Sequence, residues 1–351
     1  TNGAIRRTGL SNSSIQNGPH RSKSTGSHPP TRVVVDRETV ELKRLEKRIG
    51  RIHFQQRLGI ENDRATQIFG RGRTFFHIEN WYSIHTLIRL TLRGLGLYGR
   101  GLRNAAAIEI RHNEVILPKL PEAFDGFTLL HLSDLHLDMD PAYPAALIER
   151  LQQTDYDICV MTGDFRAKTY GDFDAAIAAL TEVRPHLRGP VYAILGNHDS
   201  IRMVPAIEAL GITLLLNESV VLERDGARIH LAGIDDPHYY QVDNFDKATT
   251  HISPEELSIL LSHSPETYRH AAHADFDLML SGHTHGGQIC LPGGIALMTN
   301  ADCPRRFCRG AWRHHAMQGY TSTGSGASVV GVRYNCPPEI TLHRLKIQPD
   351  Q

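Results

Sequence analysis

Five short polar clusters, each directly after an apolar run, hold the residues of this sequence that are able to do chemistry. In chain order they are Ser133-Asp134-Leu135-His136, Gly163-Asp164, Gly196-Asn197-His198-Asp199, the single His263, and Gly282-His283-Thr284-His285. Carboxylate, amide and imidazole side chains are the donors that divalent metal ions bind in proteins. The clusters together therefore predict a metal centre.

The spacing within the clusters supports this interpretation. Asp134 and His136 are two residues apart, and so are His283 and His285, so the members of each pair share a face in an extended segment. Mixed oxygen and imidazole donors favour Mn, Fe or Zn over Ca, which prefers oxygen alone. The glycines before Asp164, Asn197 and His283 are expected to let the backbone turn sharply, so that each ligand points inward.

Histidine is common in this chain, which has 21 of them. An isolated one, such as His186, His238 or His273, is expected to be an ordinary polar residue rather than a ligand. His263 is also isolated, and only its position after an apolar run distinguishes it. Cys303 and Cys308 are read as ordinary thiols.

The apolar runs before the clusters predict the strands of a layered α/β domain that starts near Pro121. The expected strands are 127–132, 158–161, 191–195, 257–261 and 278–280. Helical patterns fill 144–152, 173–183, 201–210 and 265–272. A hairpin is predicted over 220–234, turning at Asp225-Gly226. Because sites in open α/β sheets form at the carboxyl ends of strands, the clusters are expected to meet at one edge.

The front of the chain has a different composition. Residues 1–120 contain 21 Lys and Arg against 9 Asp and Glu, whereas the rest contains 17 against 29. Residues 1–31 are polar and predict a disordered tail, and residues 33–51 predict an exposed helix or arm. An amphipathic basic helix is predicted over 81–103. It fits a helix lying on a membrane surface or one packed on the catalytic domain equally well.

The clusters and their order resemble the calcineurin-like metallophosphoesterase superfamily, over about Pro121 to Leu345. Segments 282–288 and 331–340 resemble a bacterial branch with membrane-associated phosphodiesterases and lipid-A-precursor pyrophosphatases. The resemblance implies a four-layer α/β/β/α sandwich, here with an N-terminal basic helical extension (32–120) before the catalytic domain (121–351). It also implies two divalent metal ions (Mn, Fe or Zn) and hydrolysis of a phosphate ester by metal-bound water.

The resemblance assigns roles to individual residues. The first metal would be held by Asp134, His136 and His285, the second by Asn197, His263 and His283, and Asp164 would bridge them. His198 would stabilise developing charge or protonate the leaving oxygen. Asp199 would orient an imidazole. Arg305 and Arg306 are candidates for gripping a second phosphate, since arginine matches phosphate oxygens; a solvated charge cluster explains them equally well.

Three functions are compatible with the sequence. The first is hydrolysis of a phosphodiester or pyrophosphate bond in a lipid-linked or nucleotide-sugar substrate at an anionic membrane surface. The second is a nuclease or nucleotide phosphodiesterase that binds nucleic acid through the basic front third. The third is a non-enzymatic metal-binding scaffold, which the full set of ligand types argues against.

The remaining features concern location. Five scattered cysteines argue against a disulfide framework and favour a reducing compartment. The sequence contains no run of eighteen mainly apolar residues and no charged-then-apolar opening, so it predicts neither a spanning helix nor a signal peptide within it. We expect a cytoplasmic protein, peripheral on the inner face of the membrane.

Overall fold

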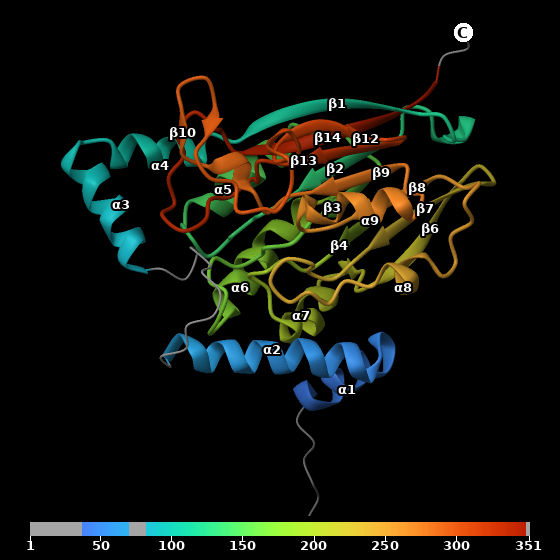
Figure 1. The fold of residues 1–351 in the computed structure, drawn as a ribbon, viewed down its shortest axis with the longest axis horizontal. Coiled ribbons are helices and arrows are strands. Elements are labelled where there is room, and N and C mark those ends of the chain that lie inside the picture. The colour runs from blue at the N-terminus through green and yellow to red at the C-terminus, as the bar shows by residue number, and fades with distance from the viewer. Residues whose placement is uncertain (1–36, 70–81, 349–351) are drawn as a thin grey trace, which may run out of the picture. The chain divides into compact units, whose positions relative to one another are not determined.

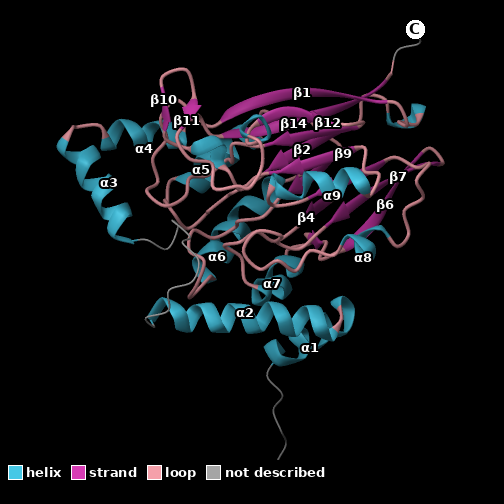
Figure 2. Cartoon of the chain, in the orientation of Figure 1, coloured by secondary structure: helices cyan, strands magenta, loops and turns pink. Residues whose placement is uncertain are grey.

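The structure is a computed structural model that describes residues 37–69 and 82–348. The predicted tail, residues 1–31, lies outside the described residues, as does Trp81 of the predicted amphipathic helix. The described chain forms two six-stranded sheets that lie face to face, with helices on their outer faces (Figures 1 and 2).

The first sheet has the strand order β1-β14-β2-β3-β4-β5. Its strands are β1 (Glu109–Leu117), β14 (Glu339–Ile347), β2 (Thr128–Leu132), β3 (Ile158–Met161), β4 (Val191–Ala193) and β5 (Thr213–Leu214). Strands β2 to β5 are parallel, so their carboxyl ends share one edge. Strand β14 runs antiparallel to β2, and β1 pairs with β14 in parallel.

The second sheet has the strand order β12-β13-β9-β8-β7-β6. Its strands are β12 (Gly310–His314), β13 (Met317–Thr321), β9 (Leu278–Ser281), β8 (Ser258–Leu261), β7 (Ala227–Gly233) and β6 (Glu218–Arg224). The four inner strands are parallel, and the edge strands β12 and β6 are antiparallel to their neighbours.

A buried apolar layer between the sheets holds them together. It is built from alternate residues of both sheets, including Leu129, Val160, Ile229, Ile259 and Leu280, all at most 1% exposed. Helices α5 (Tyr143–Leu151), α6 (Asp174–Val183) and α7 (Val204–Ala209) cover the other face of the first sheet, and α8 (Phe245–Thr249) and α9 (Tyr268–His273) that of the second. The predicted four-layer α/β/β/α architecture is confirmed.

The elements predicted around the clusters are present. Each of the five expected strands corresponds to β2, β3, β4, β8 or β9, and the expected helices correspond to α5, α6, η4 (Ile201–Met203) with α7, and η5 (Pro265–Thr267) with α9. The hairpin of β6 and β7 turns at Asp225 and Gly226, with φ of 51° and 81°. Positive φ at both positions suits a tight two-residue turn.

Within the described residues, the helix predicted over 33–51 is present, but it is not a free arm. Helix α1 (Arg37–Ile49) forms, but Leu45 and Ile49 are 4% and 2% exposed and pack into the core beneath the helices of the first sheet. Helix α2 (Arg51–Phe69) adds Phe54 to the same core. The apolar residues of a mixed-charge helix are thus buried against the catalytic domain, because burying them removes apolar surface from water.

The helix predicted over 81–103 is two helices, α3 (Tyr82–Gly94) and α4 (Tyr98–Ala106). They are separated at Gly96, whose φ of 69° is outside the helical range. Helix α4 packs on the domain through Gly101, where an added Cβ would lie 2.7 Å from Val332. Helix α3 instead exposes Leu87 and Leu90. Helix α4 therefore packs on the domain, as one of the two interpretations predicted; the membrane-surface interpretation stays a prediction.

The predicted start of the catalytic domain at residue 121 is not a structural boundary. Strand β1, at residues 109–117, is a full member of the first sheet and pairs with β14 along its whole length. A short hairpin, β10 (Cys290–Leu291) and β11 (Ile295–Ala296), follows the last polar cluster. None of the described helices is both long and apolar enough to span a bilayer.

Candidate metal centre

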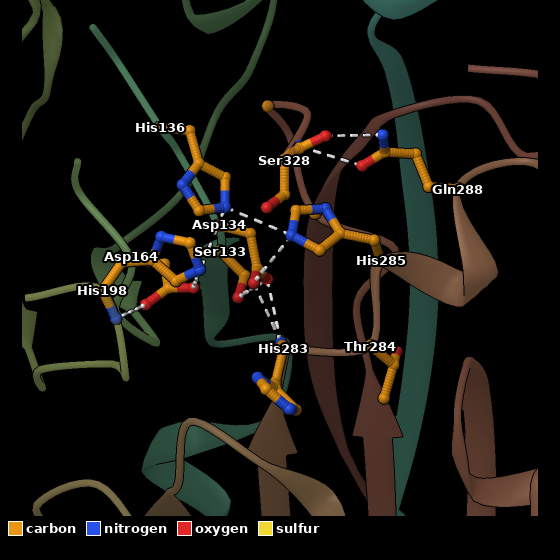
Figure 3. Close-up of polar contacts among 12 residues, drawn as sticks. Ser133, Asp134, His136, Asp164, His198, His283, Thr284, His285, Gln288 and Ser328 are labelled. Atoms are coloured by element: carbon orange, nitrogen blue, oxygen red, sulfur yellow. Dashed lines mark hydrogen bonds and ion pairs between the residues drawn. The ribbon is translucent and has the colours of Figure 1, made fainter. Parts of the chain in front are cut away.

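The polar clusters meet where the parallel strands of the two sheets end. Clusters after β2, β3 and β4 come from the first sheet, and those after β8 and β9 come from the second. Figure 3 shows Asp134, His136, Asp164, His198, His283 and His285 close together. Three sets of side chains have donor atoms within 4.8 Å of one another: Asp134 with His136 and His285, His136 with Asp164 and His198, and Asp134 with Asp164 and His263. All of these residues are buried.

The first group of donors lies around Asp134. The Nε2 atoms of His136 and His285 are 3.2 Å apart, and His285 Nε2 is 3.5 Å from Asp134 Oδ1. The far nitrogen of His136, Nδ1, donates to the Arg166 carbonyl at 2.8 Å. Such an outward bond fixes the tautomer, so that Nε2 presents its lone pair to the centre.

A second group lies around Asn197. Its Oδ1 is 2.8 Å from His263 Nε2 and 2.9 Å from His283 Nδ1. The other ring nitrogens of these histidines face backbone carbonyls, His263 that of Thr162 at 2.7 Å and His283 that of Asn300 at 2.8 Å. In both rings the remaining nitrogen therefore points toward Asn197 Oδ1.

Asp164 lies between the two groups. Its Oδ2 is 3.4 Å from His263 Nε2, 3.8 Å from His136 Nε2 and 3.9 Å from His198 Nε2. Its Oδ1 accepts the backbone N–H of His198 at 2.8 Å. The carboxylate is thus held by the cluster after β4 and faces histidines of both groups.

The backbone carries the strain of this convergence. Five candidate ligands have positive φ, from 42° to 68°: Asp134, His136, Asp164, His283 and His285. This conformation is uncommon for residues other than glycine and is concentrated at functional sites.

Of the three glycines that were predicted to allow a sharp backbone turn, only Gly163 does so. Gly163 has a φ of 91°, as a sharp turn requires. Gly196 and Gly282 do not have positive φ; an added Cβ would lie 2.2 Å from Asp164 Oδ1 and 1.8 Å from Ser133 Oγ, respectively. They are glycines because the carboxylates approach the backbone too closely for a side chain.

A buried hydrogen-bond chain runs through the first sheet to the metal centre. Its members, in order, are Asn113, His343, His131, Thr162, Ser133 and Asp134. Burial lowers the pKa of His131 to about 3 and that of His343 well below its ordinary value. Both rings are therefore neutral, and each can accept on one nitrogen and donate from the other.

The donors of this chain all point the same way. The Asn113 amide donates to His343, the His343 ring to His131 at 3.3 Å, and the His131 ring to Thr162 Oγ1 at 2.9 Å. Thr162 then donates to Ser133 Oγ at 2.7 Å, and Ser133 to Asp134 Oδ2 at 2.5 Å. The last bond fixes one oxygen of a candidate ligand. Sequence reasoning missed this chain, although His131 stands in β2 and Ser133 directly precedes Asp134.

The N-terminal extension reaches the metal centre through α2. Arg57 is fully buried, and its Nη2 donates to the Asp199 carbonyl at 2.9 Å. Its Nη1 lies 3.1 Å from Asp235 Oδ1, and the guanidinium stacks 3.5 Å over the Tyr240 ring. Glu61, one turn later, accepts from Ser200 Oγ and from the Ile201 N–H, both at 2.7 Å. Helix α2 therefore holds both ends of the loop that carries Asn197 and His198.

Arg333 contacts His285 of the last cluster and the loop that contains Gly324 and Gly326. Its buried guanidinium donates to the carbonyls of Gly324 and Gly326 at 3.1 and 2.6 Å, and one nitrogen lies 3.3 Å from His285 Nδ1. Gln288 grips the neighbouring loop by donating to the Ser328 carbonyl and accepting from its N–H (Figure 3). Both residues belong to the two segments that carry the resemblance to a bacterial branch, but their sequence did not reveal these roles.

Asp199 is not placed to orient an imidazole. Its carboxylate accepts backbone N–H groups of Gly196, Asp164 and Phe165, at 2.7 to 2.9 Å. Burial and the charge of Asp164 together raise its pKa to about 6. Asp199 therefore ties the cluster after β3 to the cluster after β4, and its role is to position backbone.

Burial dominates the electrostatics of the imidazoles. It lowers the pKa of His283 and His285 well below the ordinary value, which leaves both rings in the neutral form that binds metal. Burial also acts to lower the pKa of His263, but the Asp164 carboxylate outweighs it and raises that pKa well above the ordinary value. His263 thus supplies the positive charge beside Asp164, and a divalent cation can supply it instead.

His198 borders the centre without joining either group. Its Nδ1 donates to the Ala167 carbonyl at 2.8 Å, which turns Nε2 toward the centre. Burial lowers its pKa to about 4, against an opposing effect of Asp164. The ring is therefore neutral at neutral pH, and an anionic phosphate beside Nε2 would favour its protonated form.

Arg305 and Arg306 lie in the turn η7 (Arg305–Phe307), and both are exposed. Arg305 donates to the Ala296 carbonyl at 3.2 Å, and Arg306 stacks over the Phe307 ring at 4.7 Å. The cavity that adjoins His198 is lined by other cations, Arg89 and Lys168.

The donor set fits divalent metal ions. Two buried carboxylates, one amide oxygen and four neutral or carboxylate-paired imidazoles aim their atoms at a common volume. Asn197 Nδ2 has no hydrogen-bond partner among the described residues, which is consistent with an amide that is oriented by what its oxygen binds. Oxygen and nitrogen donors in this mixture suit transition metals rather than Ca.

Comparison with known proteins gives consistent matches. The family model described as "Calcineurin-like phosphoesterase" matches residues 127–287. The uncharacterized metallophosphoesterases YkoQ and YkuE of Bacillus subtilis (strain 168) are 31% and 30% identical, over 62% and 68% of this chain and 83% and 86% of theirs. The phosphodiesterase YaeI of Escherichia coli (strain K12) is 27% identical over 62% of this chain and 82% of its own.

Proposed function

This chain belongs to the calcineurin-like phosphoesterase family and is a metal-dependent phosphoester hydrolase, and from that premise we propose that it cleaves a phosphodiester or pyrophosphate bond at the centre described above. The observation that carries the proposal is the gathering of Asp134, Asp164 and the four imidazoles at the meeting edge of the two sheets. The name of the Escherichia coli relative supports the diester preference.

We assign the ligands as follows. Asp134, His136 and His285 would hold one ion, Asn197, His263 and His283 would hold the other, and Asp164 would lie between them. Bound there, the ions would supply activation of water and stabilisation of charge on the phosphate oxygens. The assignment follows the two donor groups, each of which converges independently of the other.

His198 is assigned to the leaving group. Its bond to the Ala167 carbonyl fixes the ring, and Nε2 faces the centre beside Asp164. When an anionic phosphate raises the pKa of this ring, Nε2 gains a proton that it can donate to the departing oxygen. Asp199 keeps the backbone of this cluster in place through its three N–H bonds.

The test is mutation of the two central residues. Asp164→Asn and His198→Ala are each expected to lower kcat by about 100-fold or more, in manganese-dependent hydrolysis of bis(p-nitrophenyl) phosphate. Asp164→Asn removes charge between the ion sites, and His198→Ala removes the proton donor. Circular dichroism establishes that the variants are folded.

Two matched variants serve as controls. Asp155→Asn alters a carboxylate that is 97% exposed, and His186→Ala alters an exposed histidine. Both should retain wild-type activity. Wild-type rates in both Asp164→Asn and His198→Ala would rule out the mechanism.

We also propose that the substrate is lipid-linked or a nucleotide sugar, and that the enzyme works at an anionic membrane surface. Helix α3 supports this location, because Leu87 and Leu90 are 63% and 60% exposed beside the exposed Arg89 and Arg93. Exposed leucines next to arginines are typical of helices that lie on membranes.

The hairpin β10–β11 and the two residues after it also expose apolar side chains. Leu291, Ile295, Leu297 and Met298 are 46% to 62% exposed. Tyr334 connects the hairpin to the α3–α4 linker, because its carbonyl accepts from Cys290 N–H and its hydroxyl donates to the Leu97 carbonyl.

Nucleic acid is the less favoured substrate. In the basic extension, Arg48 pairs with Glu208 at 2.6 Å and with Glu218 at 3.4 Å, and Arg57 is buried against Asp235. These arginines stabilise the fold, so part of the positive charge that suggested nucleic-acid binding is already compensated.

A further inference from the structure

A cavity of about 350 Å³ opens beside the metal centre, under helix α3. We call it the α3 pocket. Its lining includes His85 and Arg89 from α3, Met139 from the loop after β2, Lys168 from the loop after β3, His198, and Val329. Its size is at the small end of the range for ligand sites in proteins.

The α3 pocket shares a wall with the proposed reaction site. His198 lines the pocket while its Nε2 faces Asp164. Ala167, whose carbonyl holds the His198 ring, lines it too. A substrate whose phosphate lies at the metal centre therefore extends past His198 into this cavity.

Two cations give the pocket its charge. Lys168 is exposed, and Arg89 donates from one guanidinium nitrogen to the Val329 carbonyl at 3.0 Å, which leaves its other N–H groups for a ligand. The one carboxylate in the lining, Asp138, accepts the Ala167 N–H at 2.6 Å. Positive charge thus exceeds negative charge in the lining, and arginine matches phosphate oxygens well.

The wall that Ser328 and Val329 form has an unusual backbone conformation. Val329 has a φ of 64°, which is rare for a β-branched residue. Gln288, three residues after the last candidate ligand, holds this loop through two hydrogen bonds to Ser328. The pocket is therefore constructed by the same segment that supplies His283 and His285.

We propose that the α3 pocket binds the second phosphate of a pyrophosphate diester whose first phosphate lies at the metal centre. The inference rests on the proposed function and specifies its substrate class. In the reaction, a water oxygen bonds to the first phosphorus and the bond from that phosphorus to the bridging oxygen breaks. The bridging oxygen leaves with the second phosphate, and the two protons of water are shared between the two phosphate monoesters formed.

The test compares substrates with and without a second phosphate, using the full chain with manganese. Arg89→Ala and Lys168→Ala are each expected to lower kcat/KM for UDP-glucose by about tenfold relative to kcat/KM for bis(p-nitrophenyl) phosphate, as loss of one charged hydrogen bond predicts. The loss should appear mainly in KM. A UDP-linked acyl sugar, tested in parallel, distinguishes a lipid-linked from a soluble source of the pyrophosphate.

Two further variants sharpen the comparison. Arg89→Gln keeps an N–H donor for the Val329 carbonyl but removes the charge, so it should show a loss similar to that of Arg89→Ala; recovery by Arg89→Gln would show a merely structural role. Arg313→Ala removes an exposed arginine of β12, outside the α3 pocket, and should leave the ratio of the two kcat/KM values at its wild-type level.

The outcomes separate the two proposals. A wild-type enzyme that hydrolyses bis(p-nitrophenyl) phosphate but neither pyrophosphate overturns the pocket assignment alone. Equal losses on all substrates in Arg89→Ala and Lys168→Ala overturn it as well. A wild-type enzyme with no activity on any phosphoester, although it binds manganese, overturns the proposed function itself.

Discussion

The hydrogen bonds behind Asp134 show how single residues prepare a metal ligand. A carboxylate that is to bind a cation must be deprotonated and must point in one direction, and Ser133 Oγ holds its Oδ2 at 2.5 Å. The backbone N–H of His283 reaches the same carboxylate at 3.0 and 3.1 Å. These groups orient Asp134 before an ion arrives, which lowers the cost of assembling the site.

We predict that Ser133→Ala weakens manganese binding by about 10- to 100-fold, the usual effect of removing a partner of a metal ligand. The variant removes the bond to Asp134 and leaves Thr162 without its acceptor. Isothermal titration with manganese measures the affinity directly.

Ser281→Ala is the matched control for this prediction. Ser281 Oγ is also buried beside the centre but has no hydrogen-bond partner within the described part of the chain. Its removal should therefore leave the affinity within about twofold of wild type, since no bond is lost. Equal affinities of Ser133→Ala and the wild type would contradict the orienting role of Ser133.

At the scale of elements, helix α2 acts as a clamp on the loop between β4 and α7. Arg57 and Glu61 lie one turn apart on its inner side, and together they bind the Asp199 carbonyl, Ser200 and the Ile201 N–H. Arg57 also neutralises the buried Asp235, which His53 contacts at 2.8 Å. A segment far from the clusters in sequence thus becomes part of the support for the centre.

We predict that Arg57→Met lowers the free energy of unfolding by about 3–5 kcal/mol, the usual cost of removing one partner of a buried ion pair. The double variant Arg57→Met with Asp235→Asn should be less destabilised than the single one, because Asp235 is then no longer an unpaired buried charge. Urea denaturation followed by circular dichroism measures both.

Arg48→Ala is the control for the clamp. It breaks partly exposed ion pairs between α1 and the domain, so its effect should stay within about 1 kcal/mol. If Arg57→Met were no more destabilising than Arg48→Ala, α2 would not be a clamp.

At the scale of the whole molecule, the centre exists because two sheets meet. Ligands from the first sheet and ligands from the second are brought together by the apolar layer between the sheets, which is almost completely buried. On the same molecule, α3 exposes Leu87 and Leu90 and contributes Arg89 to the α3 pocket.

We predict that the full chain sediments with vesicles containing phosphatidylglycerol and that binding weakens as salt is raised, because screening reduces attraction between arginines and anionic lipid. The double variant Leu87→Glu with Leu90→Glu should lower vesicle binding by about tenfold or more, since each leucine that enters the interface contributes about 1.5–3 kcal/mol.

A third exposed apolar residue tests the location. Ile52, at the start of α2, is 83% exposed, and Ile52→Glu should bind vesicles as the wild type does. Equal binding by the leucine variant and the wild type would show that α3 does not contact the membrane.

The sequence by itself determined the elements that surround the clusters. Strands such as Ile158–Met161 and the turn at Asp225-Gly226 follow from local patterns, apolar runs and turn chemistry, which act over a few residues. The donor types were readable for the same reason, since Asp134 and His136 stand directly after such a strand. The prediction of the family was based on these local features, and the comparisons establish that the prediction is correct.

Only the tertiary structure determined which residues from distant parts of the sequence are in contact. The burial of Arg57, the chain from His343 to Asp134 and the placement of Arg89 beside His198 depend on contacts between residues 29 to 212 positions apart in the sequence. A charged residue in a helix has the same local pattern whether it faces water or a buried carboxylate. Packing determines which applies, and packing is a property of the whole chain.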